Sequence, residues 1–483
     1  MKKLVPKHPL AIRWMHWINF PVLFAMIWSG LLIYWANDVY KVRVGHDILY
    51  TFFPNGFYKT LNLSHRLAEG MAFHFVFMWI FFVNGTVYVL YTLFSGEWRH
   101  LFPNKRSFKE GWQVLLHDLH IRKTIPPQGK FNGAQRIAYT GIIVMGFFSV
   151  LTGLAIYKPV QLGWLAACFG GYATARIIHF ILTLGYCLFF VIHVVQVILA
   201  GWNNFRAMVT GWEVVDFPHK PEAPVPAPAP SASPKVPARP IQKQINRRTF
   251  ISFSAFALLG VAAWKTWFGI KDAPQSDGVQ KPLRKLLNTD EKIFKPTLSD
   301  NHLAKTYPTN QAARNVRVNS NVGTRPQGFD PAAWRLQVQT QDKGLLSISI
   351  DELKALPKTE YAFEFKCIEG WSQISWWGGV RFSDFINHYG LQKEAALEYV
   401  GMSTPDDQYY IGIDRTSALH PQTILAYEMT GQPLPVNHGA PLRLIIPVKY
   451  GVKNLKRIGK IHFSNDRPRD YWFERGYDYY CGL

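Results

Sequence analysis

The stretch YAFEFKCIEGWSQISWWGGVRFSDF, residues Tyr361–Phe385, decides how the C-terminal half of the chain is organised. Its opening residues, Tyr361–Lys366, alternate between apolar and polar side chains, a pattern that predicts a half-buried β-strand. Cys367 follows at the end of that strand, before a turn rich in Gly and Trp. A thiol in this position is either a buried structural cysteine or a ligand for a soft metal. Disulfide pairing with a near neighbour is excluded, because the other cysteines are distant in sequence: Cys168, Cys187 and Cys481.

The residues around Cys367 resemble the molybdenum-ligand segment of the sulfite oxidase family of molybdopterin oxidoreductases, in particular its methionine-sulfoxide reductase type. The resemblance covers about residues 308–477 and implies a molybdopterin cofactor, with the catalytic thiolate of Cys367 bound to molybdenum. A soft sulfur ligand suits a metal that takes part in oxygen-atom transfer. The matching positions are Cys367, Glu369, Gly370, Trp371, Ser372, Trp377, Gly379 and Val380.

A second segment, HGAPLRLIIPVKYGVKNLK, resembles the part of this family that holds the pterin and its phosphate. A buried phosphate needs guanidinium, ammonium and backbone donors around it, whereas the alternative for the lysines is a solvated basic face. Thr404 matches, less specifically, a threonine near the metal in the methionine-sulfoxide reductase type. The cofactor-binding residues that the segment implies are His438, Arg443, Lys449, Lys453 and Lys456.

Short alternating segments elsewhere in residues 271–483 predict strands, and two short helices intervene, so the sequence predicts a strand-rich α+β domain. The chain ends soon after Tyr477, so we expect the dimerisation domain of the eukaryotic sulfite oxidases to be absent and the catalytic unit to be a monomer. The predicted strands are Trp334–Val338, Leu346–Ile350, Glu398–Val400 and Pro441–Pro447, and the predicted helices are Asp351–Leu356 and Phe382–His388.

The N-terminal half is apolar, and four of its uncharged windows are long enough to cross a membrane, which takes about 20 residues. The formal net charge of the chain is +21, but the cations gather beside apolar windows, which indicates topology and not nucleic-acid binding. The positive-inside rule then places both ends of this bundle in the cytoplasm. No cleavable N-terminal signal is expected, because the first apolar run is too long. The windows are Trp14–Asn37, Gly70–Gly96, Ile137–Tyr157 and Ile177–Phe205.

Histidines inside these windows predict two haem sites, because ionisable groups at membrane depth are rare and usually functional. His179 and His193 are fourteen residues apart, which returns them to one helix face about 21 Å apart. His16 is expected level with His193, and His74 level with His179. Each level offers the two imidazoles that a b-type haem iron takes as axial ligands. His65 is the alternative to His74, although we expect it at the outer surface.

The patterns RWMHW and AFHF, with the paired histidines of the fourth window, resemble the di-haem cytochrome b family of nickel-iron hydrogenases and formate dehydrogenases, of the cytochrome b561 type. This resemblance implies an all-α transmembrane four-helix bundle over residues 1–211, with two haem b groups. Residues 212–246 are rich in Pro and Ala and are predicted to form an extended linker. Residues 247–270 are predicted to form a fifth transmembrane helix.

Arg247 and Arg248 precede this fifth apolar stretch and resemble a twin-arginine export signal, although an ordinary membrane span with a basic flank explains them equally well. Either reading places the last domain outside the cytoplasm, as expected of a multi-pass protein of the bacterial inner membrane with a periplasmic catalytic domain.

The chain is therefore expected to be a multidomain membrane oxidoreductase that exchanges electrons with quinone or quinol and passes them through two haems to a molybdenum site. We expect it to reduce an S-oxide or N-oxide. The alternatives are sulfite-type oxidation that delivers electrons to quinone, a non-catalytic electron-transfer protein, and a ferric reductase built on the haem half alone. Membrane lipid is an expected partner, and nucleic acid is not.

Overall fold

The computed structural model describes residues 2–44, 47–124, 130–216, 241–297, 302–324 and 329–483. The chain forms two compact units whose boundaries lie within the long helices. The first unit contains residues 1–24, 79–150 and 179–272, and the second contains residues 25–78, 151–178 and 273–483. The second unit thus joins parts of the apolar helices to the entire strand-rich half of the chain.

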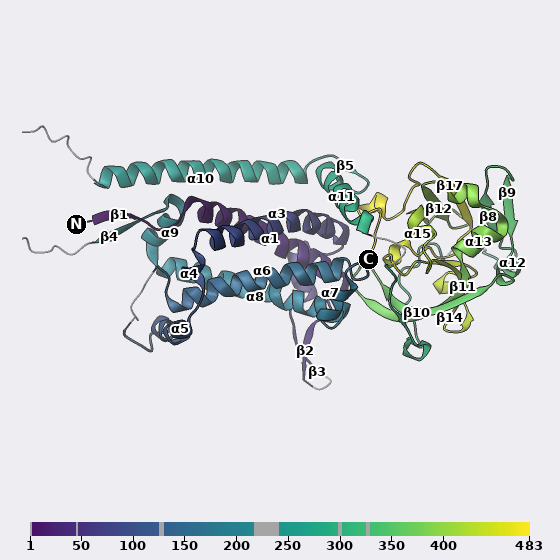
Figure 1. Ribbon diagram of the computed structural model, residues 1–483, viewed down its shortest axis with the longest axis horizontal. Helices are drawn as coiled ribbons and strands as arrows, with labels where there is room; N and C mark the ends of the chain where they lie inside the picture. Colours follow the sequence, from purple (N-terminus) through teal and green to yellow (C-terminus); the bar gives the residue numbers. More distant parts are fainter. Residues whose placement is uncertain (1, 45–46, 125–129, 217–240, 298–301, 325–328) are drawn as a thin grey trace, which may run out of the picture. The chain divides into compact units, whose positions relative to one another are not determined.

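Five helices are long and apolar enough to cross a membrane, which confirms the predicted number of spans among the described residues (Figure 1). Each exposes most of its apolar surface, as expected of helices surrounded by lipid. They are α1 (Leu10–Tyr34, continued by η1, Trp35–Asn37), α3 (Leu67–Phe94), α6 (Gly133–Tyr157), α8 (Tyr172–Leu199) and α10 (Ile241–Lys271).

The fourth span differs from the predicted Ile177–Phe205 at both ends. Helix α8 begins at Tyr172 and ends at Leu199, and a separate helix, α9 (Gly201–Thr210), follows. Gly201 adopts a φ of +78°, a left-handed conformation that glycine tolerates and that breaks the helix at this point. The prediction was wrong here because the apolar residues on both sides hide the break.

The predicted linker, residues 212–246, is ordered at both of its ends. Strand β4 (Trp212–Asp216) pairs antiparallel with β1 (Lys2–Pro6), and α10 already begins at Ile241. The remaining part of the predicted linker, 217–240, lies outside the described residues. The ammonium of Lys7 reinforces the strand pair, because it binds Asn204 at 3.1 Å and Glu213 at 2.8 Å.

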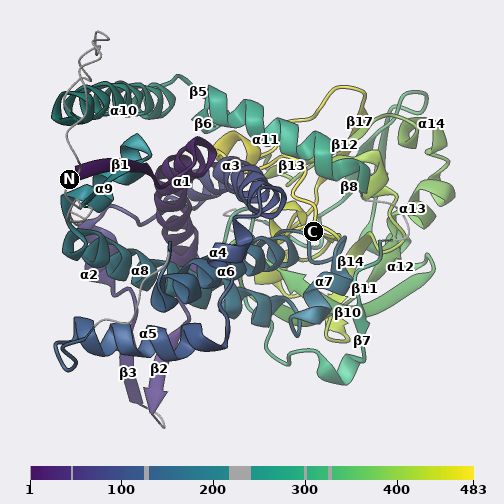
Figure 2. The ribbon, with the colours of Figure 1, turned by 60° about the vertical axis from the view of Figure 1, so that its left-hand side comes forward.

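Short elements connect the long helices. Helix α5 begins with a capping box, in which Asn104 and Ser107 each accept a hydrogen bond from the other's backbone N–H. Strands β2 and β3 pair antiparallel (Figure 2). These connecting elements are β2 (Lys41–Val44), β3 (Asp47–Thr51), α2 (Asn55–Thr60), α4 (Trp98–Leu101), α5 (Lys105–Asp118) and α7 (Gly163–Cys168).

The strand-rich half contains two main sheets, which confirms the predicted α+β class. One has the strand order β15-β14-β11-β10-β7, with β16 also paired to β14, and the other has the order β13-β12-β17-β8-β9. The first sheet consists of β7 (Thr306–Tyr307), β10 (Lys358–Lys366), β11 (Ser372–Arg381), β14 (Ile424–Met429), β15 (Gln432–Pro433) and β16 (Arg443–Ile445). The second consists of β8 (Leu336–Gln339), β9 (Leu345–Ile348), β12 (Tyr399–Ser403), β13 (Tyr410–Asp414) and β17 (Lys460–Ser464).

The predicted strands and helices of this half are present with bounds shifted by a few residues. Helix α12 (Ile350–Lys354) is capped by Ser349, whose hydroxyl accepts a hydrogen bond from the Glu352 amide at 3.2 Å. The remaining elements are β5 (Gln275–Ser276), β6 (Val279–Gln280), α11 (Lys281–Phe294), η2 (Lys295–Thr297), η3 (Thr309–Gln311), α13 (Phe382–Tyr389), α14 (Gln392–Ala395), α15 (Arg415–Ala418), η4 (Val436–His438), η5 (Gly451–Lys453) and η6 (Phe473–Arg475).

The hairpin of β10 and β11 is the centre of the first sheet. Its two strands pair along their whole length, from Lys358 opposite Val380 to Lys366 opposite Ser372. The predicted Gly- and Trp-rich turn is shorter than expected, because Trp377 and Gly379 lie inside β11. Trp377 packs in a buried apolar cluster, which explains why a large aromatic residue occupies the strand.

Gly379 lies at a bulge of β11, where the register against β14 shifts. A Cβ atom at this position would collide with the carbonyl oxygen of Leu425 on β14. The neighbouring Gly378 is different, because a Cβ there would lie 3.1 Å from the end of the flexible Lys358 side chain. Of these two glycines, Gly379 therefore requires the absence of a side chain and Gly378 does not.

We predict that Gly379→Ala destabilises the strand-rich half by about 1–3 kcal/mol, because β14 must move away from β11. Thermal unfolding of the full chain in detergent measures the effect. Gly378→Ala is the matched control and should unfold close to the wild type, since the Lys358 side chain can give way. Equal stability of the two variants would contradict this account of the bulge.

Candidate active site

The predicted ligand Cys367 lies in the tight turn between β10 and β11, which two backbone hydrogen bonds close. Its amide donates to the carbonyl of Trp371 at 2.9 Å, and the amide of Gly370 donates back to the Cys367 carbonyl at 2.9 Å. Gly370 has a φ of +92°, which only glycine adopts without strain. We name residues Cys367–Trp371 the cysteine turn. It holds the thiol in a fixed place at the end of a paired strand.

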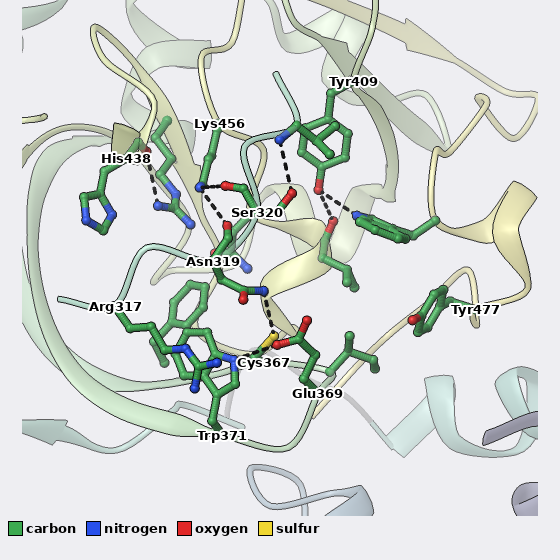
Figure 3. Close-up of a pocket in the computed structure, with 18 residues that line it drawn as sticks. Arg317, Asn319, Ser320, Cys367, Glu369, Trp371, Tyr409, His438, Lys456 and Tyr477 are labelled. Atoms are coloured by element: carbon green, nitrogen blue, oxygen red, sulfur yellow. Dashed lines mark hydrogen bonds between the residues drawn. The ribbon is translucent and has the colours of Figure 1, made fainter. Parts of the chain in front are cut away.

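The thiol of Cys367 is 4% exposed and borders a pocket in the strand-rich half (Figure 3). The amide nitrogen of Asn319 lies 3.6 Å from its sulfur. Burial, aided by the negative charge of Glu369, raises the pKa of Cys367 to about 12. A thiol with so high a pKa stays protonated at pH 7 unless a metal cation displaces its proton. The site therefore favours a metal-bound thiolate over an unbound, nucleophilic thiolate.

Arg443, on β16, lies in the same pocket with its guanidinium buried. Its Nη1 donates to the His438 carbonyl at 3.2 Å, and its charge lies over the ring of Trp377 at 4.8 Å. Its Nε has no hydrogen-bond partner, and none of the described carboxylates forms an ion pair with it. Burial lowers the pKa of Arg443 to about 10. The residue is thus a buried cation without a counter-ion.

His438 and Lys456 complete the cationic side of the pocket. Lys456 donates to the carbonyls of Asn319 and Ser320, both at 2.8 Å, so it fixes the segment that faces the cysteine turn. Burial, followed by the nearby Arg443, lowers the pKa of Lys456 to about 7. Burial, Arg443 and Lys456 together lower the pKa of His438 to about 4, which leaves this imidazole neutral at pH 7.

The structure places the other predicted cofactor residues away from this pocket. Lys449 donates to the Tyr480 carbonyl at 2.7 Å and pairs with Asp414, and Lys453 pairs with Asp470. Both lysines are buried, which excludes the solvated basic face that we considered as the alternative, whereas their role in cofactor binding stays a prediction. The buried pairs neutralise both charges and give the lysines a structural role.

Thr404 is also buried outside the lining of the pocket. Its hydroxyl donates to Asp406 at 2.6 Å and accepts from the Tyr409 amide at 3.1 Å. Tyr409 does line the pocket, so Thr404 acts on the site only through this neighbour.

Sequence reasoning missed one complete wall of the pocket, which comes from the segment NVRVNSNVGT. Arg317 lies over the ring of Trp371 at 4.7 Å, and Asn319 reaches the thiol. Nothing in this segment marks it as a site, because its short alternation of Val with polar residues points to no ligand and it lies about fifty residues before the cysteine turn. Aromatic residues from the C-terminal part also line the pocket, namely Tyr409, Trp472 and Tyr477.

These residues fit a molybdopterin cofactor. The unpaired Arg443 can neutralise an anionic phosphate, and the buried thiol of Cys367 is a suitable soft ligand. Among the described residues, no group of three or more His, Cys, Asp and Glu side chains could hold a metal ion. A metal in this pocket would therefore take Cys367 from the protein and its other ligands from the cofactor.

In the first unit, His16 of α1 and His193 of α8 face each other. Their ring centroids are 6.1 Å apart, and the Nδ1 of His16 is buried without a hydrogen-bond partner. Two metal–imidazole bonds of about 2 Å each fit between rings at this separation. The pair therefore fits the predicted haem site.

His74 and His179 belong to different units, His74 to the second and His179 to the first, so their pairing remains a prediction. The Nδ1 of His74 lies 3.0 Å from the Ser29 hydroxyl, which itself donates to the Ala25 carbonyl at 2.6 Å. This arrangement makes Nδ1 the donor and leaves the lone pair on Nε2. His65 is exposed and precedes α3, at a φ of +59°.

Comparisons with known proteins match both halves of the chain. A family model described as prokaryotic cytochrome b561 matches residues 7–211, and one described as oxidoreductase molybdopterin-binding domain matches residues 322–472. A relative from Azospira oryzae, named provisionally as protein-methionine-sulfoxide reductase subunit YedZ1, is 38% identical over 38% of this chain and 69% of its own length. A match under the same name is 31% identical over 44% of this chain and 98% of its own length.

The protein-methionine-sulfoxide reductase catalytic subunit MsrP of Xanthomonas campestris is 33% identical over 29% of this chain and 48% of its own length. The chain thus spans about half the length of this catalytic subunit. The crystal structure of sulfane dehydrogenase SoxCD from Paracoccus pantotrophus covers 29% of this chain at 16% identity, with a TM-score of 0.26 that is too low for a fold comparison.

Proposed function

This membrane oxidoreductase belongs to the prokaryotic cytochrome b561 family in its N-terminal half and to the molybdopterin-binding oxidoreductases in its C-terminal half, and we propose that it reduces S-oxides with electrons from quinol. The observation that carries the proposal is the pocket in which Cys367, a soft metal ligand, lies with the unpaired cation Arg443. The names of the relatives support a sulfoxide as substrate.

The reaction balances with two electrons and two protons. A sulfoxide R₂SO takes up both and yields the sulfide R₂S and water, while one quinol releases two electrons and two protons and becomes quinone. When bound, the molybdenum cofactor supplies the redox centre that accepts the oxygen atom from sulfur. The protein's part is to hold that centre, to bind the substrate and to deliver the electrons.

The residues of the pocket divide these tasks. Cys367 binds the metal, and Arg443 neutralises the anionic cofactor. The aromatic side chains of Trp371, Trp472 and Tyr477 give the pocket a surface for a thioether or sulfoxide, because sulfur makes favourable contacts with aromatic rings. The neutral His438 adds a polar group without adding a charge.

Two b haems carry the electrons in this proposal. His16 and His193 hold one haem, which the 6.1 Å separation of their rings supports. His74 and His179 hold the other, and the hydrogen bond from His74 to Ser29 supports the orientation that a ligand needs. We assign the catalytic domain to the periplasmic side, an assignment that the distribution of Lys and Arg and the five spans support.

The haem ligands are tested by haem content. We expect the wild type to bind two haems per chain, and each of His16→Ala, His193→Ala, His74→Ala and His179→Ala to lose about one, because one imidazole cannot replace two axial ligands. The pyridine haemochrome spectrum measures the content. His65→Ala is the matched control and should keep both haems. Loss of a haem in His65→Ala, with none lost in His74→Ala, would reverse the assignment.

The proposed sidedness is tested with a reporter. Alkaline phosphatase, which is active only outside the cytoplasm, should be active when it is fused after Leu483. Replacing Arg247 and Arg248 by Lys should abolish this activity if a twin-arginine exporter carries the domain. Unchanged activity in this variant would make α10 an ordinary span. An inactive alkaline phosphatase fusion to the wild type, together with an active fusion of a reporter that works only in the cytoplasm, would contradict the periplasmic assignment.

The ligand role of Cys367 is tested by Cys367→Ser. This variant should keep both haems and the pterin, because Arg443 still holds the phosphate, but should lose sulfoxide reduction because a hard hydroxyl replaces the soft thiolate. Haem reduction by quinol, haem reoxidation by methionine sulfoxide and molybdenum content are measured on the purified chain. Normal substrate-driven reoxidation in Cys367→Ser would refute the metal-ligand role.

Arg443→Met gives the complementary result, since it should lose the cofactor itself. A charge-assisted contact contributes about 1.5–3 kcal/mol, so we expect the pterin content to reflect binding that is about 10- to 150-fold weaker. Lys393→Met, which removes an exposed cation paired with Asp342, is the control and should keep the cofactor.

A further inference from the structure

The second unit joins residues 25–78 and 151–178 of the apolar half to residues 273–483. Within it, the first turns of α8, up to Ile178, lie against the cysteine turn, so the start of this helix and the candidate metal ligand share one compact body. The contacts between them decide how the two are held together.

The central contact is made by Arg176 on α8. Its guanidinium donates to the carbonyl of Gly370, inside the cysteine turn. A Cβ atom on Gly370 would lie 2.9 Å from the Nη2 of Arg176, so the glycine both allows the turn and admits the guanidinium. None of the described carboxylates forms an ion pair with Arg176, whose charge lies instead 5.9 Å from the rings of Tyr40 and Tyr172. The guanidinium of Arg176 thus directs a charged hydrogen-bond donor at the cysteine turn.

Two further contacts flank this one. The ammonium of Lys366, the residue before Cys367, lies 5.7 Å from the ring of Tyr172 on α8. Ile368, the residue after it, packs on the same buried cluster as Val160, which follows α6. Lys366 thus contacts the apolar half directly, whereas Ile368 and Val160 meet through the C-terminal residues of this shared cluster.

We propose that Arg176 is a positioning residue, which holds the cysteine turn against α8. This contact keeps the Cys367 site close enough to the cytochrome half to receive its electrons. The inference rests on the proposed function. Arg176 stands three residues before His179, the proposed haem ligand, and residues three apart lie on one helix face about 4.5 Å apart along the axis. The hydrogen bond from Arg176 to Gly370 thus links the turn of α8 that precedes His179 to the cysteine turn, which contains Cys367.

The chemistry requires such a link, because each sulfoxide consumes two electrons that leave the haems one at a time. Electron transfer through a protein slows steeply with distance, so the cysteine turn must stay close to α8 during turnover. Arg176 does not line the substrate pocket, and its replacement should leave substrate binding and the metal site unchanged.

The test compares two electron donors in the full-length protein with both cofactors bound. In Arg176→Ala, reoxidation of dithionite-reduced haems by methionine sulfoxide should slow about tenfold or more, because loss of one charge-assisted hydrogen bond lowers the fraction of molecules in which the turn is held against α8. Reduced methyl viologen, which can donate to the metal site without the haems, should support sulfoxide reduction within about twofold of the wild type. Arg176→Lys, which keeps one donor, should give an intermediate rate.

A readout without turnover accompanies these rates. Hydrogen–deuterium exchange of the cysteine turn should become faster in Arg176→Ala, also in cofactor-free protein, because the turn loses its contact with α8. Arg66→Ala is the matched control, since Arg66 pairs with Glu69 on α3 and should change neither rate nor exchange.

Three results would overturn the inference: unchanged haem reoxidation in Arg176→Ala, an equal fall of the viologen-driven rate, or unchanged exchange of the turn. Failure of the proposed function is distinguishable, because the wild type itself would then reduce no sulfoxide with either donor.

Discussion

The buried guanidinium of Arg443 is the constraint on which the candidate site depends. A cation removed from water without a counter-ion is unfavourable, and among the described residues only a backbone carbonyl and two aromatic faces compensate it. The neighbouring lysines do not share this state, since Lys449 and Lys453 are paired with buried aspartates and Lys456 binds carbonyl oxygens. The charge of Arg443 is thus left for an anion in this pocket, which Glu369 also lines.

Most of the fold could be predicted because the hydrophobic periodicity of the sequence matches the helices and strands of the structure. Five apolar spans and the alternating strand before Cys367 are where the pattern places them. The errors have local causes. The break at Gly201 is a single backbone conformation inside an apolar run, and β4 depends on pairing with β1, two hundred residues earlier. A pattern within a window contains neither kind of information.

The site was predictable only in part, for a related reason. Residue type and the family resemblance identify Cys367, His438, Arg443 and Lys456, which the structure brings to one pocket. The same stretch also contains Lys449 and Lys453, and nothing in their spacing shows that aspartates on other elements neutralise them. Asn319 is the reverse case, since it contacts the thiol but belongs to a segment whose sequence indicates no ligand.

The two halves belong to a single polypeptide, in which α10 leads directly into β5. This continuity makes their association intramolecular, with an effective concentration of about millimolar for a short connection. A small set of contacts, such as those of Arg176 and Tyr172, can then keep the cysteine turn docked, although the same contacts would be too weak to assemble two separate proteins. The rate of electron delivery should consequently be independent of how much protein the membrane contains, and dilution by other membrane proteins should not uncouple the two halves.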